Sequence, residues 1–236
     1  MGKLERFQTP LPNLPALFSS FFRRREELLG HPRGEIYNLT VKKEFANLLK
    51  HELGEHKSHE LSGRDDYIFA AIKSCLPTRE KAVLNAIAFS NEPRLAQFVV
   101  DGLRHPDKGV RTEAVSAITN ITNLNEKALP SIPVFRRALW LEGKSLETTY
   151  LLMKNNKINP KHMGRTKEEL KLRAANLAHL LVFFGKLAPH SQEALPILKQ
   201  LQKNEAIKSE EIPGQKGLSK LVAIAINQIE KHTKTK

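Results

Sequence analysis

The chain has 236 residues, of which 40% are hydrophobic and 27% are charged. This length and apolar content suffice for a buried core, and the charged fraction is close to the globular average, which excludes wholesale disorder. The net charge of +13 is uneven, because residues 1–125 carry a balance of +3 and residues 126–236 one of +10. A positive field favours acidic proteins, nucleic acid or anionic lipid as partners without choosing among them.

The first predicted element is the amphipathic, phenylalanine-rich segment 9–30. Prolines interrupt its apolar stretch, and Arg23, Arg24 and Arg25 follow that stretch instead of preceding it, which argues against a secretory signal. No run reaches the roughly 18 apolar residues that a membrane span needs. We interpret the segment as a cap on the first helical unit; docking into a partner's groove or lying on a membrane surface are alternatives.

A histidine-rich stretch, HELGEHKSHE at 51–60, is the candidate metal site. A zincin helix needs histidines four residues apart, but the histidine after His51 is His56, about 140° around a helix. We favour a solvated helix end followed by a polar loop. A metal site made of His56, His59 and Glu60 is the alternative, and we expect neither metal nor cofactor.

The single cysteine, Cys75, lies in the apolar pattern YIFAAIKSCL. It has no partner within the chain for a disulfide, so we expect a buried core thiol. A reducing compartment fits this usage best, and we expect a cytoplasmic location.

Helical periodicity dominates the chain. Apolar residues recur at spacings of three and four, which predicts amphipathic helices with one buried stripe each. The clearest segments are 93–104, 109–121, 167–187, 194–202 and 217–231. No run of alternating β-branched residues and no Asn-Gly or Asp-Gly hairpin signal is present, so we expect an all-α fold.

The breaks between these helices are short. Thr78 is expected to cap a helix that starts near Arg79, and Asp107 to cap the helix that contains Val110, because both side chains accept hydrogen bonds from free backbone N–H groups. Gly143 and Gly164 are expected to separate helices in the second half.

One segment, RLAQFVVDGLRHPDKGVRTEAVSAITNI at 94–121, places a helix, a Pro-Asp corner, a Val-Arg pair and a small-residue stripe in one unit. We expect the aspartate to cap the second helix, the alanines to let helices approach closely, and the arginine to reach an aspartate of an adjacent unit. The residues concerned are Pro106, Asp107, Val110, Arg111, Ala114, Ala117 and Ile118. This order resembles a HEAT-like or armadillo-type helical repeat. The resemblance implies an α-α superhelix, a solenoid of stacked antiparallel helix pairs.

On this basis we expect a single α-helical repeat domain over residues 1–236. Residues 1–75 would form N-terminal capping helices, residues 76–155 HEAT-like helix pairs, and residues 156–236 basic C-terminal helices.

The most basic stretch is MKNNKINPKHMGRTK at 153–167, which contains no acidic residue and is expected to lie in a loop between helices. Together with two arginines nearby in sequence it forms the predicted partner-binding patch, which could contact phosphates or an acidic protein face. A merely solvated loop is the alternative. The patch comprises Arg136, Arg137, Lys154, Lys157, Lys161, Arg165 and Lys167.

The only tryptophan, Trp140, is expected to pack in the core or between repeats, with an exposed contact as the alternative. Basic residues interleaved with exposed aromatics, as single-strand binders need, are otherwise missing.

No catalytic motif is recognisable, and we expect a protein that is not an enzyme. The HEAT-like resemblance implies a non-catalytic scaffold or adaptor, which binds proteins with an acidic surface in a multiprotein complex. One alternative is a basic nucleic-acid-binding repeat protein, including a HEAT-like DNA glycosylase, in which Trp140 would serve beside Glu142. Another is a peripheral membrane or secretion-linked adaptor that uses segment 9–30.

Overall fold

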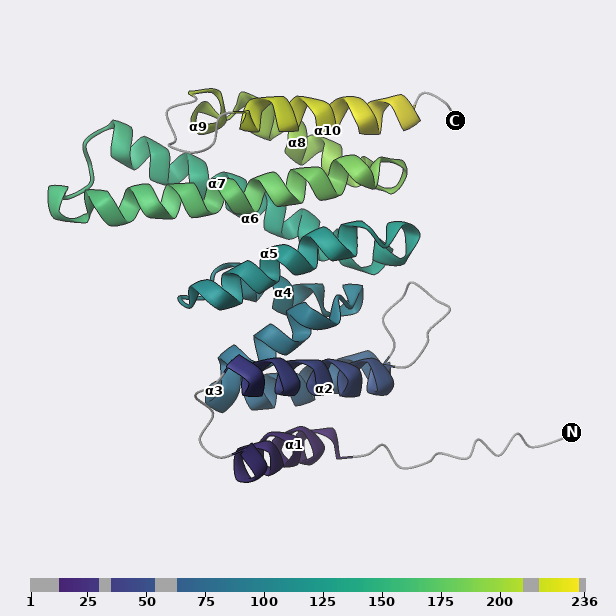
Figure 1. Ribbon diagram of the computed structural model, residues 1–236. Helices are drawn as coiled ribbons and strands as arrows, with labels where there is room; N and C mark the ends of the chain where they lie inside the picture. The colour runs from purple at the N-terminus through teal and green to yellow at the C-terminus, as the bar shows by residue number, and fades with distance from the viewer. Residues whose placement is uncertain (1–12, 30–34, 54–62, 210–216, 234–236) are drawn as a thin grey trace, which may run out of the picture. The chain divides into compact units, whose positions relative to one another are not determined.

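The computed structural model describes residues 13–29, 35–53, 63–209 and 217–233 (Figure 1). These residues form helices and short connections, with no strand among them, so the expected all-α class is confirmed. Within these ranges, none of the helices combines the length and the apolar character that crossing a membrane requires.

The chain divides into two compact units, Met1–Ser90 and Asn91–Lys236. This division differs from the boundaries expected near residues 75 and 155. Helix α3 runs through the first of these positions, and a packed pair of helices, α6 and α7, spans the second.

The N-terminal unit contains α1 (Leu14–Leu29), α2 (Glu35–Leu53) and α3 (Gly63–Ser90), which all pack against one another. Its core includes the thiol of Cys75, which is buried as expected. Pro77 lies inside α3, where its missing N–H removes a helical hydrogen bond. Two helices meet within α3 at a kink at Arg79 (φ −141°, ψ 30°), so a helix begins near Arg79 as expected, while the side chain of Thr78, its expected cap, lies outside the described residues.

Aromatic side chains hold α1 to α2. Phe18 and Phe22 of α1 are fully buried, with ring centroids 5.1 Å and 4.8 Å from that of Phe45. Aromatic pairs at these separations add to the stabilisation from burial alone. The phenylalanines of α1 that reach Phe45 are therefore used inside the unit.

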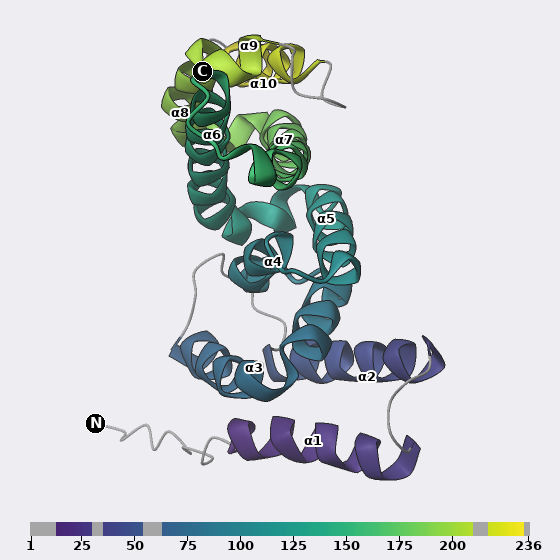
Figure 2. The ribbon, with the colours of Figure 1, turned by 90° about the vertical axis from the view of Figure 1, so that its left-hand side faces the viewer.

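The C-terminal unit is built from helices that pack in pairs. They are α4 (Ala96–Leu103), α5 (Lys108–Thr122), α6 (Ile132–Lys154), α7 (Met163–Lys186), α8 (Leu195–Lys203), α9 (Glu205–Lys208) and α10 (Leu218–Thr233). Short 3₁₀ helices join them: η1 (Pro93–Leu95), η2 (Asn125–Ser131), η3 (Pro160–His162), η4 (Ala188–His190) and η5 (Gln192–Ala194). Helix α4 packs on α5, α6 on α7, and α8 on α10. Neighbouring pairs also touch, since α6 contacts both α4 and α8 while α7 contacts both α5 and α10 (Figure 2).

The corner between α4 and α5 forms largely as the sequence predicts. Asp107 caps α5 by accepting a hydrogen bond from the Val110 N–H at 3.1 Å. A Cβ atom built on Gly102 would lie 3.1 Å from the Cβ of Ala114, which shows how closely these small residues let the two helices approach.

Arg111 does not reach an adjacent unit, contrary to expectation. Its Nη1 donates to the carbonyl oxygens of His105 at 2.8 Å and Pro106 at 2.6 Å. Both carbonyls lie between helices, where no helical N–H is available to them. The arginine therefore stabilises its own corner.

Gly143 does not separate helices, and the expectation that it would is wrong. It lies in the middle of α6, where an added Cβ atom would come within 2.2 Å of Leu201 Cδ2 on α8. The Gly143 carbonyl accepts a hydrogen bond from Asn204 Nδ2 at 3.2 Å. Gly164 likewise lies within the first turn of α7, after the break. At Gly143 the glycine provides room for a neighbouring helix.

Candidate functional site

The length of α6 and α7 creates a hollow in the C-terminal unit. These helices have 23 and 24 residues, whereas α4 and α5 have 8 and 15. At the standard helical rise, α6 is about 35 Å long and α5 about 22 Å. The α6–α7 hairpin therefore projects beyond the α4–α5 corner, at the left of Figure 1.

A cleft of about 930 Å³ lies where the projecting hairpin passes the corner. The cleft is lined by residues of the α4–α5 corner, by Glu142 of α6, and by side chains of α7 between residues 165 and 176. Its charged side chains are Arg104, Arg111, Arg165, Lys171 and Arg173, with the carboxylates Glu142, Glu168 and Glu169. The lining therefore carries two positive charges in excess. We call this hollow the arginine cleft.

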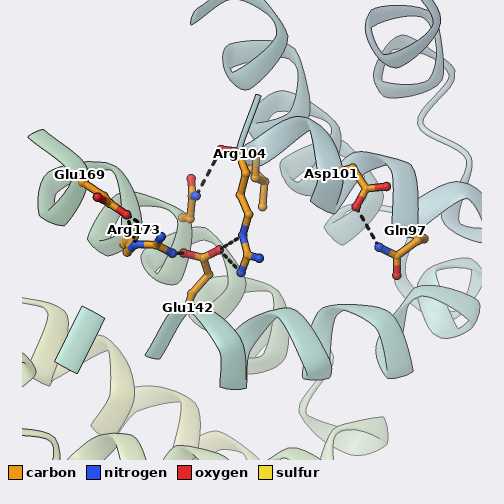
Figure 3. A network of polar contacts seen from close by, with 8 residues as sticks. Gln97, Asp101, Arg104, Glu142, Glu169 and Arg173 are labelled. Atoms are coloured by element: carbon orange, nitrogen blue, oxygen red, sulfur yellow. Dashed lines mark hydrogen bonds and ion pairs between the residues drawn. The ribbon is translucent and has the colours of Figure 1, made fainter. Parts of the chain in front are cut away.

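A buried carboxylate organises the inner wall of the arginine cleft. Glu142 is 1% exposed, and its Oε1 accepts a hydrogen bond from Arg104 Nε at 2.8 Å and forms an ion pair with Arg104 Nη2, also at 2.8 Å. Its Oε2 lies 3.4 Å from Arg173 Nη1. Figure 3 shows the two guanidinium groups approaching the carboxylate from opposite sides. A buried charge is tolerated only when it is paired, and this pairing connects α4, α6 and α7.

The arginines of the cleft are also held by other groups. Arg173 donates from Nη2 to Glu169 Oε1 at 2.6 Å, one turn away on α7. Arg111 is fixed by the two corner carbonyls. A guanidinium group carries donors on all three nitrogens, so each fixed arginine can retain unused N–H groups. Within the described residues, no hydrogen bond uses Arg104 Nη1 or Arg111 Nε and Nη2.

The structure divides the basic patch predicted from the sequence into two regions. Arg136 and Arg137 lie near the start of α6 and Lys154 at its end, about 27 Å apart along the helix. Arg136 forms an ion pair with Glu193, and Lys154 forms one with Glu205 at 3.1 Å. Arg137 is exposed and has no ion pair within the described ranges.

The remaining four residues of the patch stay together at the end of the α6–α7 hairpin. Lys157, Lys161, Arg165 and Lys167 are all exposed, and none forms an ion pair with another described residue. The first turn of α7 holds no acidic residue that would offset them. We call these four residues the hairpin tip. Arg165 also lines the arginine cleft, so the tip and the cleft are continuous.

Arg165 is the one residue of the arginine cleft that belonged to the predicted partner-binding patch; Arg104, Glu142 and Arg173 were not predicted as binding residues. No sequence pattern around Arg104 or Arg173 indicates a binding role. The position of Glu142 in the sequence, in contrast, indicates that its carboxylate is buried. Glu142 occupies a position in the apolar stripe of α6, between the buried Leu139 and Leu146. A carboxylate at such a position indicates a buried ion pair.

Trp140 is 42% exposed and is not a core residue; it lines a small hollow together with Ile197 and Gln200 of the neighbouring helix α8, which agrees with the expected packing between helix pairs. Lys144 Nζ lies 5.6 Å from its ring centroid. Residues two apart on a helix point about 200° away from each other, so Trp140 turns outward where Glu142 turns inward. The tryptophan does not line the arginine cleft, and the two residues do not share the site that a glycosylase-like centre would need.

The histidine-rich stretch is described only in part. His51 and Glu52 end α2, with His51 Nδ1 3.3 Å from Glu52 Oε1. The candidate metal ligands His56, His59 and Glu60 lie outside the described residues. Elsewhere in the described ranges, no group of three or more His, Cys, Asp or Glu side chains could hold a metal ion.

Comparison with protein-family models finds no match, and comparison with curated proteins finds no significant match either.

Proposed function

We propose that this chain is a HEAT-like α-solenoid that acts as a non-catalytic scaffold or adaptor and binds an acidic segment of a partner protein within a complex. The packing of the C-terminal unit supports the solenoid. In stacked repeats each helix pair contacts only its neighbours, and here α6 packs between α4 and α8 while α7 packs between α5 and α10.

The observation that carries the proposal is the hairpin tip. It projects past the α4–α5 corner and presents four cationic side chains that no described carboxylate neutralises. Positive charge on a projecting surface raises the rate and the specificity of association with an acidic partner. The excess positive charge of the adjoining arginine cleft extends this surface inward.

A nucleic acid is the second candidate, because the same four cations could contact phosphates. The three carboxylates in the cleft lining argue against a continuous polyanion there. A membrane-bound adaptor has less support, because Phe18 and Phe22 are buried in the core of the N-terminal unit and do not face a membrane surface. We place the adaptor in the cytoplasm, where the buried thiol of Cys75 would stay reduced.

Site-specific photocrosslinking tests the proposal. A photoreactive phenylalanine derivative is introduced at Lys161 in the hairpin tip and, as a control, at the exposed Ser116 of α5. Cells of the native host are irradiated, nuclease is added, and adducts are identified by mass spectrometry. We expect discrete protein adducts from position 161 that are absent from position 116. Adducts that nuclease removes, or equal adducts at both positions, would contradict the proposal.

A further inference from the structure

We propose that the arginine cleft binds a phosphomonoester group on an extended peptide, with Arg104, Arg111 and Arg165 as the donors. This inference rests on the proposed function for the class of partner, a protein segment. It adds the chemical group that the cleft recognises and the side chains that recognise it.

Pre-positioned guanidinium groups are the first argument. Glu142 holds Arg104 through Nε and Nη2, and the carbonyls of His105 and Pro106 hold Arg111 through Nη1. Both arginine side chains line the same cleft. Side chains already fixed in place lose little conformational freedom on binding, and the planar fork of arginine matches phosphate oxygens.

The charge of the cleft is the second argument. Its lining carries two positive charges in excess, and a phosphomonoester on a side chain carries about −1.5 to −2 at neutral pH. A single dianion would therefore neutralise the cleft. Arg165, which has no ion pair among the described residues, is the cation that such a group would engage without breaking an existing contact.

The carboxylates on the α7 wall select a peptide over a nucleic acid. Glu168 pairs with Lys171 at 2.7 Å and Glu169 pairs with Arg173 at 2.6 Å. Both carboxylates nevertheless stay exposed in the cleft lining, where they carry negative charge. A nucleic-acid strand carries a negative charge at every phosphate and would meet them. A peptide with one phosphate can place neutral or basic residues there instead.

The size and the apolar lining of the cleft agree with a peptide. Pro106, Leu172 and Ala175 contribute uncharged surface beside the arginines. The volume of about 930 Å³ lies within the range of roughly 300–1,000 Å³ that is usual for ligand sites. The cleft can thus hold the residues flanking the phosphate as well as the phosphate.

NMR titration of the full chain tests the assignment through the Nε–Hε signals of the arginine side chains. The probes are N-acetyl-phosphoserine N-methylamide, the corresponding glutamate compound, inorganic phosphate and a short single-stranded DNA. We expect saturable shifts of the Arg104, Arg111 and Arg165 signals with the phosphoserine compound, and binding weaker by roughly tenfold for the glutamate compound. Equal binding of the glutamate compound, or tighter binding of the DNA or of inorganic phosphate, would overturn the assignment.

Two variants that remove one charge each provide the matched comparison. Arg165→Gln lies in the cleft and Arg137→Gln lies outside it, and both residues are exposed without a described ion pair, so neither change should affect folding. We expect Arg165→Gln to weaken phosphoserine binding by roughly tenfold and Arg137→Gln by less than about twofold. Equal effects would show non-specific attraction and overturn the site. If phosphoserine binding fails these tests while residue 161 still gives position-specific protein crosslinks, the phosphate site is wrong and the proposed function stands.

Discussion

Arg104, which directly follows α4, and Glu142, in the middle of α6, form an ion pair across 38 positions of sequence, with Nε and Nη2 of the arginine both 2.8 Å from Glu142 Oε1. The carboxylate is 1% exposed, while the arginine side chain remains 43% exposed. The pair therefore anchors a half-exposed cation of the arginine cleft to the interior of the C-terminal unit. It also makes the geometry of the cleft depend on the packing of two helix pairs.

Removing one partner of this pair should destabilise the protein. In Arg104→Met, Glu142 keeps only the 3.4 Å contact with Arg173, so a buried carboxylate loses most of its compensation. We expect a loss of about 3 kcal/mol in the free energy of unfolding, at the low end for buried pairs because Arg104 is partly hydrated. Urea denaturation measures it. Lys171→Ala breaks the exposed pair with Glu168 and should change stability by less than about 1 kcal/mol; equal losses in the two variants would refute the burial argument.

Enlarging Gly143 should disturb the contact between α6 and α8. The Cβ atom of Gly143→Ala would lie 2.2 Å from Leu201 Cδ2, and Leu201 is only 4% exposed, so its side chain has little room to move. We expect a loss of about 1–2 kcal/mol despite the better helix propensity of alanine. Gly164→Ala, where nothing lies within 4 Å of the added atom, should be neutral or stabilising. The melting temperatures of both variants test this prediction. A higher melting temperature for Gly143→Ala would show that α8 shifts at little cost and would contradict it.

Replacing the cap of α5 tests the corner of the HEAT-like segment. Asp107→Ala removes the acceptor for the Val110 N–H and should lower the free energy of unfolding by about 1 kcal/mol. Asp107→Asn keeps a capping oxygen and should lose much less. Chemical denaturation of the two variants separates capping from charge. A large loss in Asp107→Asn would mean that the negative charge, and not the hydrogen bond, stabilises the corner.

Burial of His179 on α7 should make stability depend on pH. Desolvation lowers the pKa of its imidazole from 6.5, so the folded state binds fewer protons than the unfolded state just below that value. The contribution of His179 to the free energy of unfolding should therefore be fully present above pH 6.5, and it should be lost as the pH decreases toward the lowered pKa.

The variant His179→Gln should lose this part of the pH dependence, because glutamine does not titrate. His190→Gln changes an exposed histidine at the end of η4 and serves as the control. Melting temperatures recorded between about pH 7.5 and pH 5.5 cover the range above the ordinary carboxyl pKa values. If His179→Gln and the parent protein lose stability in parallel over this range, the effect belongs to other groups.

Local features of the fold were predictable from the sequence because neighbouring residues encode them. The apolar spacing of the segment 109–121 specifies the buried stripe of α5, and Asp107 supplies its cap from three residues before Val110. The burial of Cys75 follows from the same kind of pattern. Helical period and capping act over a few residues, so they can be recognised without knowing what the helix packs against.

The four cations of the hairpin tip belonged to the patch predicted from the sequence, whereas the arginine cleft was decided by tertiary structure. Arg104 and Arg173 meet Glu142 from positions 38 and 31 residues away, and no local pattern specifies which distant cation a buried carboxylate will find. The role of Gly143 inside α6 likewise could not be recognised locally, because the glycine leaves space for Leu201 of α8. Helix α6 separated Arg136 from Lys154 and carried the hairpin tip past the α4–α5 corner. Charge and periodicity determined a basic all-α chain, whereas helix length and packing, which act between residues far apart in sequence, determined where its charges converge.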